Sequence, residues 1–122
     1  MSKNILIVDD SRLSRMISKQ YVLSLHPDWQ IEEAATGEQA IEKAALRRPW
    51  LILLDVNMPG MGGLAAAVEL RRAAPDMHIV LLTANVQDAV RSVAERLGLG
   101  FLGKPILEPQ IHAMLNSLEP RP

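Results

Sequence analysis

Acidic, hydroxyl and amine side chains come directly after four short apolar runs of this sequence. The run ILIV precedes Asp9 and Asp10, LILL precedes Asp55, IVLL precedes Thr83, and GFLG precedes Lys104. Two carboxylates about 4 Å apart repel each other by about 4 kcal/mol at an effective dielectric constant of about 20. Three acids held close together would therefore need a proton or a bound cation, and this need is the first indication of the chemistry.

Strands must place these polar residues, and the apolar runs have the length and composition of strands buried on both faces. The runs lie at residues 5–8, 51–54 and 79–82, with a shorter one at 100–103. The more polar segment WQIEEAA at residues 29–35 fits a strand at the edge of a sheet. The sequence therefore predicts five strands.

Between the apolar runs, apolar residues recur with the spacing of amphipathic helices. The pattern i, i+3, i+4, i+7 is clearest over residues 86–97 and recurs over 111–118. Similar spacing predicts helices near residues 13–25, 41–45 and 64–68. Strands and helices are thus expected to alternate five times.

Capping residues mark the starts of two of these helices. Thr36 and Gln39 have the spacing of a capping box, and Glu108 followed by Pro109 has the order of an N-cap and a first helical residue. The alternation predicts an α/β fold, in which a doubly wound, five-stranded parallel sheet carries helices on both faces. The flavodoxin-like strand order 2-1-3-4-5 is a common arrangement of such a sheet.

In this strand order the polar residues meet at one rim of the sheet. With the strands numbered in chain order, strand 1 (residues 5–8) and strand 3 (residues 51–54) are neighbours at the topological switch point, where ligands bind in open α/β sheets. The carboxyl ends of strands 1, 3, 4 and 5 bring three aspartates, Thr83 and Lys104 to that rim. Asp and Thr are also ordinary helix caps, but the convergence of all five side chains favours a functional site.

The side chains at the predicted rim are suited to phosphoryl transfer onto an aspartate. Mg²⁺ binds one or two carboxylates, keeps several waters and bridges to phosphoryl oxygens, so it would offset the repulsion among the acids. Lys104 would add a second positive charge, and Thr83 would add a hydroxyl donor. A carboxylate nucleophile beside such groups can accept a phosphoryl group.

Composition argues against several other functions. The chain has 13 Lys and Arg against 14 Asp and Glu, so no basic excess favours nucleic acid as a partner. Its apolar runs are far too short for a membrane-spanning helix or a signal peptide. The absence of cysteine is compatible with a cytoplasmic location. His26, His78 and His112 are too scattered to predict a metal cluster.

The segments ILIVDDS, LILLDVNMPGMGG, IVLLTAN and FLGKP resemble, in order and spacing, the signature segments of the receiver domain of bacterial two-component response regulators. Each segment alone would be a weak signal, but together they cover essentially the whole chain. The resemblance implies the flavodoxin-like (βα)5 receiver fold. It also implies a receiver domain over residues 1–119, a tail at 120–122 and no effector domain.

The resemblance implies roles for the acidic residues. Asp55 matches the phosphoacceptor. Asp10 matches the direct ligand of Mg²⁺, and Asp9 matches a neighbour that usually acts through water. Asn57 matches the residue whose backbone carbonyl ligates the metal, so its side chain is not needed for that role.

Further roles follow on strands 4 and 5. Thr83 matches the hydroxyl residue that engages the phosphoryl group, and Lys104 matches the lysine that pairs with a phosphoryl oxygen. The bond from Lys104 to Pro105 would be cis. Phe101 matches the switch aromatic that turns inward when Thr83 moves, whereas its residue type alone favours an ordinary packing role. Because Phe101 lacks a hydroxyl, such a switch would depend on packing.

The implied function is a phosphorylation-dependent signalling switch that catalyses only its own phosphorylation and dephosphorylation. The phosphoryl group would come from a histidine kinase or a histidine phosphotransfer protein. The fourth helix, fifth strand and fifth helix would then present a changed surface to a partner protein or a relay. The expected docking face for the donor is the start of the first helix, at Ser11, Arg12, Leu13 and Ser14.

Two other functions are weaker alternatives. A metal-dependent phosphohydrolase with an aspartyl nucleophile would use similar chemistry, but haloacid-dehalogenase-type enzymes carry a D-x-D motif after their first strand, whereas Asp9 and Asp10 are adjacent. A nucleotide- or flavin-binding domain is disfavoured, because neither G-x-G-x-x-G nor G-x-x-x-x-G-K-[ST] occurs.

Overall fold

Strands and helices alternate along the chain, as the apolar runs predict. The computed structural model describes residues 3–58, 60–84 and 88–119, so part of the stripe predicted over 86–97 and the predicted tail at 120–122 lie outside it. In chain order the elements are β1 (Asn4–Val8), α1 (Arg12–Leu25), β2 (Gln30–Ala34), α2 (Gly37–Arg47), β3 (Leu51–Asp55), α3 (Gly62–Ala73), β4 (His78–Thr83), α4 (Asp88–Leu97), β5 (Gly100–Gly103) and α5 (Glu108–Leu118).

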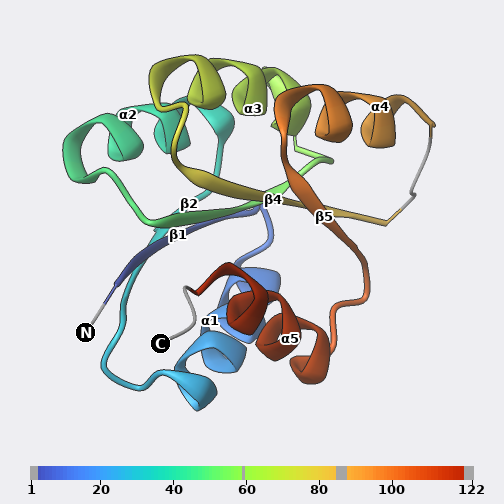
Figure 1. Cartoon of the computed structure of the whole chain (residues 1–122). Helices are drawn as coiled ribbons and strands as arrows, with labels where there is room; N and C mark the ends of the chain where they lie inside the picture. Colours follow the sequence, from blue (N-terminus) through green and yellow to red (C-terminus); the bar gives the residue numbers. More distant parts are fainter. Residues whose placement is uncertain (1–2, 59, 85–87, 120–122) are drawn as a thin grey trace.

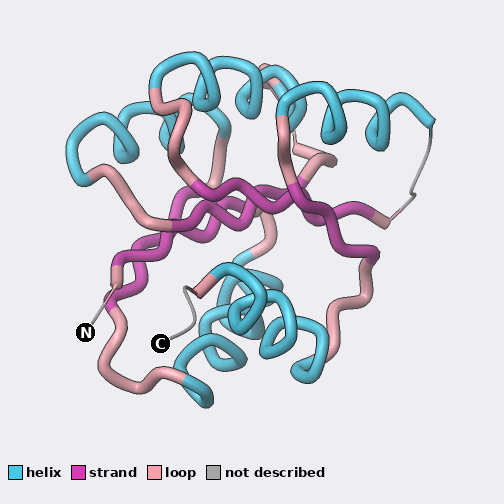
Figure 2. Tube along the Cα trace, in the orientation of Figure 1, coloured by secondary structure: helices cyan, strands magenta, loops and turns pink. Residues whose placement is uncertain are grey.

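The five strands form one parallel sheet in the order β2-β1-β3-β4-β5. Helices α2, α3 and α4 cover one face of the sheet, and α1 and α5 cover the other (Figure 1). The strands therefore form the middle of three layers (Figure 2). The predicted fold class, including the strand order and the edge position of β2, is confirmed.

Side chains that alternate along the strands build two apolar cores, one on each face of the sheet. On β1, Leu6 and Val8 join the core beneath α2, α3 and α4, whereas Ile5 and Ile7 join the core against α1 and α5. β3 is buried along its whole length. Burial on both faces explains why these strands read as continuous apolar runs.

One predicted helix start is confirmed and the other is wrong by one residue. Thr36 is the N-cap of α2, and its hydroxyl accepts a hydrogen bond from the Gln39 N–H at 3.1 Å. The N-cap of α5 is Leu107, so Glu108 is the first helical residue. The Gln110 side chain accepts from the Leu107 N–H at 3.0 Å, which lets the helix begin before the expected Glu108 cap.

Aromatic and histidine rings pack together near the amino-terminal ends of the strands. The Trp29 ring stacks on His26 at 3.7 Å and meets the Trp50 ring edge-on at 5.4 Å. His78 lies edge-on to Trp50 at 5.2 Å. Burial, followed by the positive charge of Arg71, lowers the pKa of His78 below 6.5. Trp29 and Trp50 are thus packing residues.

We expect the lowered pKa of His78 to make the fold less stable as the pH falls. Below pH 6.5 the unfolded chain binds a proton at His78 more readily than the folded chain does. The free energy of unfolding therefore decreases as the pH falls from 6.5 toward the lower pKa of the folded state. Urea denaturation at neutral pH and at about pH 5 should show a shallower pH dependence for His78→Gln than for the wild type. Equal slopes would contradict this expectation.

Candidate functional site

Four strands bring polar residues to the same rim of the sheet. Asp55 and Thr83 end β3 and β4, while Asp9 directly follows β1 and Lys104 directly follows β5. Asp9 and Asp55 are each 2% exposed and Thr83 is 1% exposed, whereas Asp10 is exposed. These strands are neighbours in the parallel sheet, so the four residues share one rim, as the strand-end pattern predicted.

Asp9, Asp10 and Asp55 form an acidic cluster. One carboxylate oxygen of each residue lies within 4.8 Å of the other two. Within the described part of the chain, this is the one group of three or more side chains placed to ligate a metal. Its donor atoms are all carboxylate oxygens, the ligands preferred by hard divalent cations. The cluster can therefore hold a metal ion.

Lys104 links the two buried acids. Its Nζ donates to Asp9 Oδ2 at 3.0 Å and lies 3.0 Å from Asp55 Oδ1. The backbone N–H of Lys104 donates to the Thr83 carbonyl at 2.7 Å, which ties the end of β5 to β4. The bond between Lys104 and Pro105 is cis, as the family resemblance predicts. An ammonium group is thus held between the acceptor candidate and its acidic neighbour.

The site shifts the pKa values of Asp55 and Lys104. Burial raises the pKa of Asp55 above 3.8, and the charge of Asp9 adds to this, while the hydrogen bond from Lys104 offsets part of it. Burial alone would lower the pKa of Lys104, but its contacts with both carboxylates raise it above 10.5. Ionised Asp55 is therefore costly in the folded state, and a further cation would relieve that cost.

Two predicted residues lie at the margin of the cluster. The backbone N–H of Asn57 points to Asp55 Oδ1 at a long 3.4 Å. Phe101 lies two residues before the end of β5, half-buried against the core under α4, with the Arg91 guanidinium 5.8 Å from its ring centroid. Phe101 is therefore outside the acidic cluster. It lies on β5, the strand that leads directly into Lys104.

A glycine lets the chain after β3 pack closely against the end of that strand. A Cβ atom at Gly63 would lie 2.2 Å from the Asp55 carbonyl oxygen and 2.6 Å from the Val56 Cα. Neither contact is possible for a larger residue without a backbone shift. The start of α3 can therefore pack directly against the end of β3 only with glycine at position 63.

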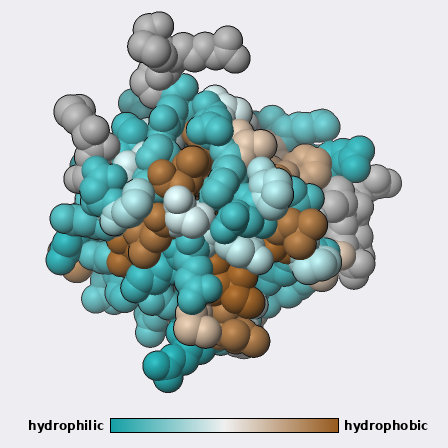
Figure 3. Space-filling model, turned by 90° about the horizontal axis from the view of Figure 1, so that it is seen from below, coloured by the Kyte–Doolittle hydropathy of each residue, from teal (hydrophilic) through white to brown (hydrophobic). Residues whose placement is uncertain are grey.

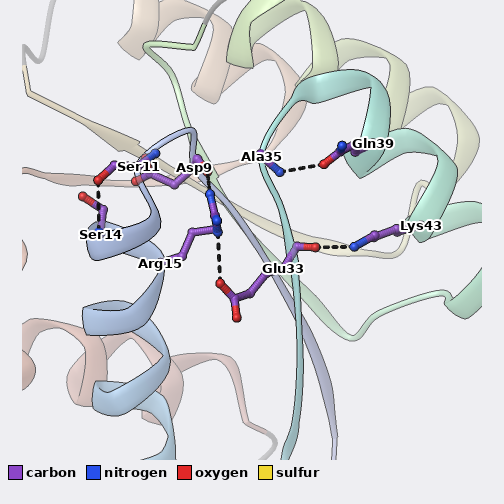
Figure 4. A network of polar contacts seen from close by, with 8 residues as sticks. All are labelled: Asp9, Ser11, Ser14, Arg15, Glu33, Ala35, Gln39 and Lys43. Carbon is purple, nitrogen blue, oxygen red and sulfur yellow. Dashed lines mark hydrogen bonds and ion pairs between the residues drawn. The ribbon is translucent and has the colours of Figure 1, made fainter.

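Sequence reasoning missed Arg15 and Glu33, which lie next to the acidic cluster. Arg15, near the start of α1, donates from Nη1 to the Asp9 carbonyl at 2.6 Å, and its Nε pairs with Glu33 Oε1 at 3.0 Å (Figure 4). The two residues are 18 positions apart and belong to different elements, so no local motif joins them. The available signal was a basic residue one helical turn after the N-cap Ser11.

The family of the chain is shown by a match to a protein-family model, and the fold and acidic cluster agree with it. The model of the response regulator receiver domain matches residues 5–116. The chain belongs to this family. Receiver domains are signalling switches of two-component systems that interact with kinases or phosphotransfer proteins, and membership supports phosphorylation-dependent signalling.

Relatives of this receiver domain differ in length. Chemotaxis protein CheY of Thermotoga maritima is 30% identical over 120 residues, which cover 97% of this chain and 98% of that protein. The nitrate/nitrite response regulator protein NarL of Escherichia coli K12 is 40% identical over 108 residues, or 87% of this chain. This chain spans 49% of NarL and 61% of the response regulator GacA of Pseudomonas protegens.

Solved structures show the same fold as this receiver domain. CheY4 of Vibrio cholerae superposes with a TM-score of 0.85 at 27% identity, over 98% of this chain and 100% of that chain.

Within the described ranges, none of the helices has the length and hydropathy needed to cross a bilayer.

Proposed function

We propose that this receiver domain is a switch that accepts a phosphoryl group on Asp55. The observation that carries the proposal is the position of Asp55: its carboxylate is buried at the rim, within 4.8 Å of two further acids and 3.0 Å from the Lys104 amine. Burial also raises the pKa of Asp55. Negative charge gathered around a buried nucleophile fits a site that works with a cation and an incoming phosphoryl group.

The residues of the acidic cluster fit Mg²⁺. We propose that the carboxylates of Asp10 and Asp55 and the backbone carbonyl of Asn57 hold the ion, with Asp9 acting through water. When bound, Mg²⁺ would neutralise part of the cluster and of the negative charge on the phosphoryl oxygens. An all-oxygen donor set of this charge supports the choice of a hard cation over a softer metal.

The protein's own groups have separate roles in the transfer. An Asp55 carboxylate oxygen attacks phosphorus as the bond from phosphorus to the donor histidine nitrogen breaks, so one P–O bond replaces one P–N bond. Lys104, now shared between Asp9 and Asp55, pairs with a phosphoryl oxygen. Thr83 offers its hydroxyl to the same group from the end of β4. We propose that this engagement of Thr83 is coupled to an inward turn of Phe101.

An apolar patch on α1 supports a docking surface for the phosphoryl donor. Leu13, Met16 and Ile17 are 61%, 49% and 36% exposed, and Leu107 is 56% exposed. A groove of about 270 Å³, lined by Ile17 and Leu107 among others, leads to Asp9 and Lys104. Figure 3 shows the α1–α5 side of the molecule, where apolar areas interrupt a hydrophilic surround. A histidine kinase or phosphotransfer protein is the proposed partner.

Leu13→Ser combined with Met16→Ser should slow phosphoryl transfer from the partner protein about tenfold, because apolar contacts at a docking surface are lost. Labelling by acetyl phosphate should be unchanged, since a small donor needs no docking surface. The matched control is Leu46→Ser on α2, where the leucine is 78% exposed and outside the patch. Equal loss with both donors would reject the docking surface.

A groove beside β5 supports the proposal of an output surface on α4, β5 and α5. A groove of about 500 Å³ lies along this edge strand and is lined by Phe101 and Leu102 and by Met114 and Leu118 of α5. A movement of Phe101 would change the shape of this groove. The proposed readout of phosphorylation is therefore contact with a downstream protein or a phosphorelay partner.

Turnover separates the proposed switch from a phosphohydrolase. With Mg²⁺ and acetyl phosphate in excess, the switch should retain at most one acid-stable, hydroxylamine-labile phosphoryl group per chain. Release of inorganic phosphate should be slow after this label has formed. Rapid release of many phosphates per chain, with little retained label, would instead support the hydrolase.

A further inference from the structure

The backbone and the side chain of Asp9 are both held by partners. Its N–H donates to the Ala34 carbonyl at 3.1 Å, and its C=O accepts from Arg15 Nη1 at 2.6 Å. Its carboxylate accepts from the Ser11 N–H at 2.9 Å and from Lys104 Nζ at 3.0 Å. The peptide unit that joins Asp9 to Asp10 therefore has its carbonyl end fixed by a guanidinium group from α1.

Arg15 itself is held in place by the edge strand. Its Nε pairs with Glu33 Oε1 at 3.0 Å, and the Lys43 amine of α2 donates to the Glu33 carbonyl (Figure 4). The side chain of Arg15 is only 15% exposed. Arg15 thus joins α1, β2 and the end of β1 and is too covered to serve as a contact for a large partner.

We propose that Arg15 is a positioning residue of the acidic cluster. By holding the Asp9 carbonyl, it fixes the orientation of the Asp9–Asp10 peptide unit and so the directions in which both carboxylates leave the backbone. This inference rests on the proposed function, because the orientation matters only if the cluster binds a cation. Partners behind a metal ligand commonly set its orientation and affinity in this way.

Electrostatics alone would give Arg15 the opposite effect. A positive charge beside the cluster repels a cation, and removing it would tighten cation binding. Glu33 compensates that charge at 3.0 Å, so the guanidinium can provide geometry without opposing the ion. Lysine cannot reproduce this contact, since Nη1 and Nε act together as a planar fork between the Asp9 carbonyl and Glu33.

The test is a Mg²⁺ titration of the full chain, followed by the NMR signals of the Asp10 and Ser11 amides. Arg15→Met and Arg15→Lys should each weaken Mg²⁺ binding about tenfold. Glu33→Gln, which keeps Arg15 but leaves its charge uncompensated, should weaken binding less. The matched control is Arg47→Met. Arg47 pairs at 3.0 Å with Glu32, which is next to Glu33 on β2, but it makes no contact with Asp9 among those described. This control should bind Mg²⁺ like the wild type.

Melting temperatures with EDTA and with Mg²⁺ distinguish positioning from a structural role. Positioning predicts that the rise in melting temperature on adding Mg²⁺ is smaller in both Arg15 variants than in the wild type. A lower melting temperature with an unchanged rise and an unchanged Mg²⁺ affinity would overturn the inference. Tighter binding in Arg15→Met with wild-type binding in Arg15→Lys would also overturn it, in favour of charge repulsion. A wild-type chain that binds no Mg²⁺ would instead overturn the proposed function, and this inference with it.

Discussion

Replacing Lys104 with methionine is expected to lower the free energy of unfolding of the metal-free protein by about 3 kcal/mol. The substitution removes the ammonium group that lies 3.0 Å from both Asp9 and Asp55, whose side chains are each 3% exposed. Two poorly hydrated carboxylates would then repel each other without compensation. Chemical denaturation in EDTA at neutral pH measures the loss.

The pH dependence of this loss separates a missing charge from altered packing. The raised pKa of Lys104 means that its stabilising charge is present below 10.5 and is lost only as the pH rises through the folded-state value. In acid, Asp55, whose pKa is raised, takes up a proton and its repulsion with Asp9 is lost, so Lys104→Met should approach the wild type. Lys19→Met, at a half-buried lysine within α1, is the control and should cost little. A loss that is equal at neutral and acidic pH would contradict the electrostatic account.

Asp55→Asn is expected to abolish phosphoryl acceptance and to raise the melting temperature of the metal-free protein. The amide cannot replace the carboxylate as a nucleophile toward phosphorus. Because the pKa of Asp55 is raised, the folded state binds more protons than the unfolded state between pH 3.8 and the folded-state value, and stability falls as the pH rises through that window. Mass spectrometry after incubation with acetyl phosphate and thermal unfolding in EDTA measure the two effects.

Asp10→Asn provides the comparison for this variant, because it removes one acidic charge and keeps the acceptor. It should also stabilise the metal-free protein by relieving repulsion in the cluster, and it should weaken Mg²⁺ binding. For scale, a cation at ten times its dissociation constant stabilises a protein by about 1.4 kcal/mol. Unchanged stability together with unchanged Mg²⁺ affinity in Asp10→Asn would argue against crowding of the acids.

The sheet and the polar residues at its rim could be predicted from sequence because burial on both faces leaves a simple pattern. β3 is wholly buried and reads as LILL followed by Asp55. Helical crossovers make neighbouring strands parallel, so the residues after each apolar run must share one rim. Asp9, Thr83 and Lys104 are therefore expected near Asp55 whatever their side-chain torsions.

Contacts that depend on side-chain geometry between elements were not predictable in the same way. The pairing of Arg15 with Glu33 and the Asp9 carbonyl joins three elements through one guanidinium group. The start of α5 depends on Gln110 reaching back to the Leu107 N–H, a contact that competes with the expected Glu108 cap. Residue types permit several such contacts, and tertiary packing selects among them.

Localisation of the phosphoryl group by mass spectrometry tests the central claim most directly. After incubation with acetyl phosphate, the account predicts a single phosphoryl group on Asp55 that forms with Mg²⁺ and does not form in EDTA. A chain that stays unlabelled with Mg²⁺ and donor in excess would contradict the account, as would a label on another residue or one that forms equally well without a divalent cation.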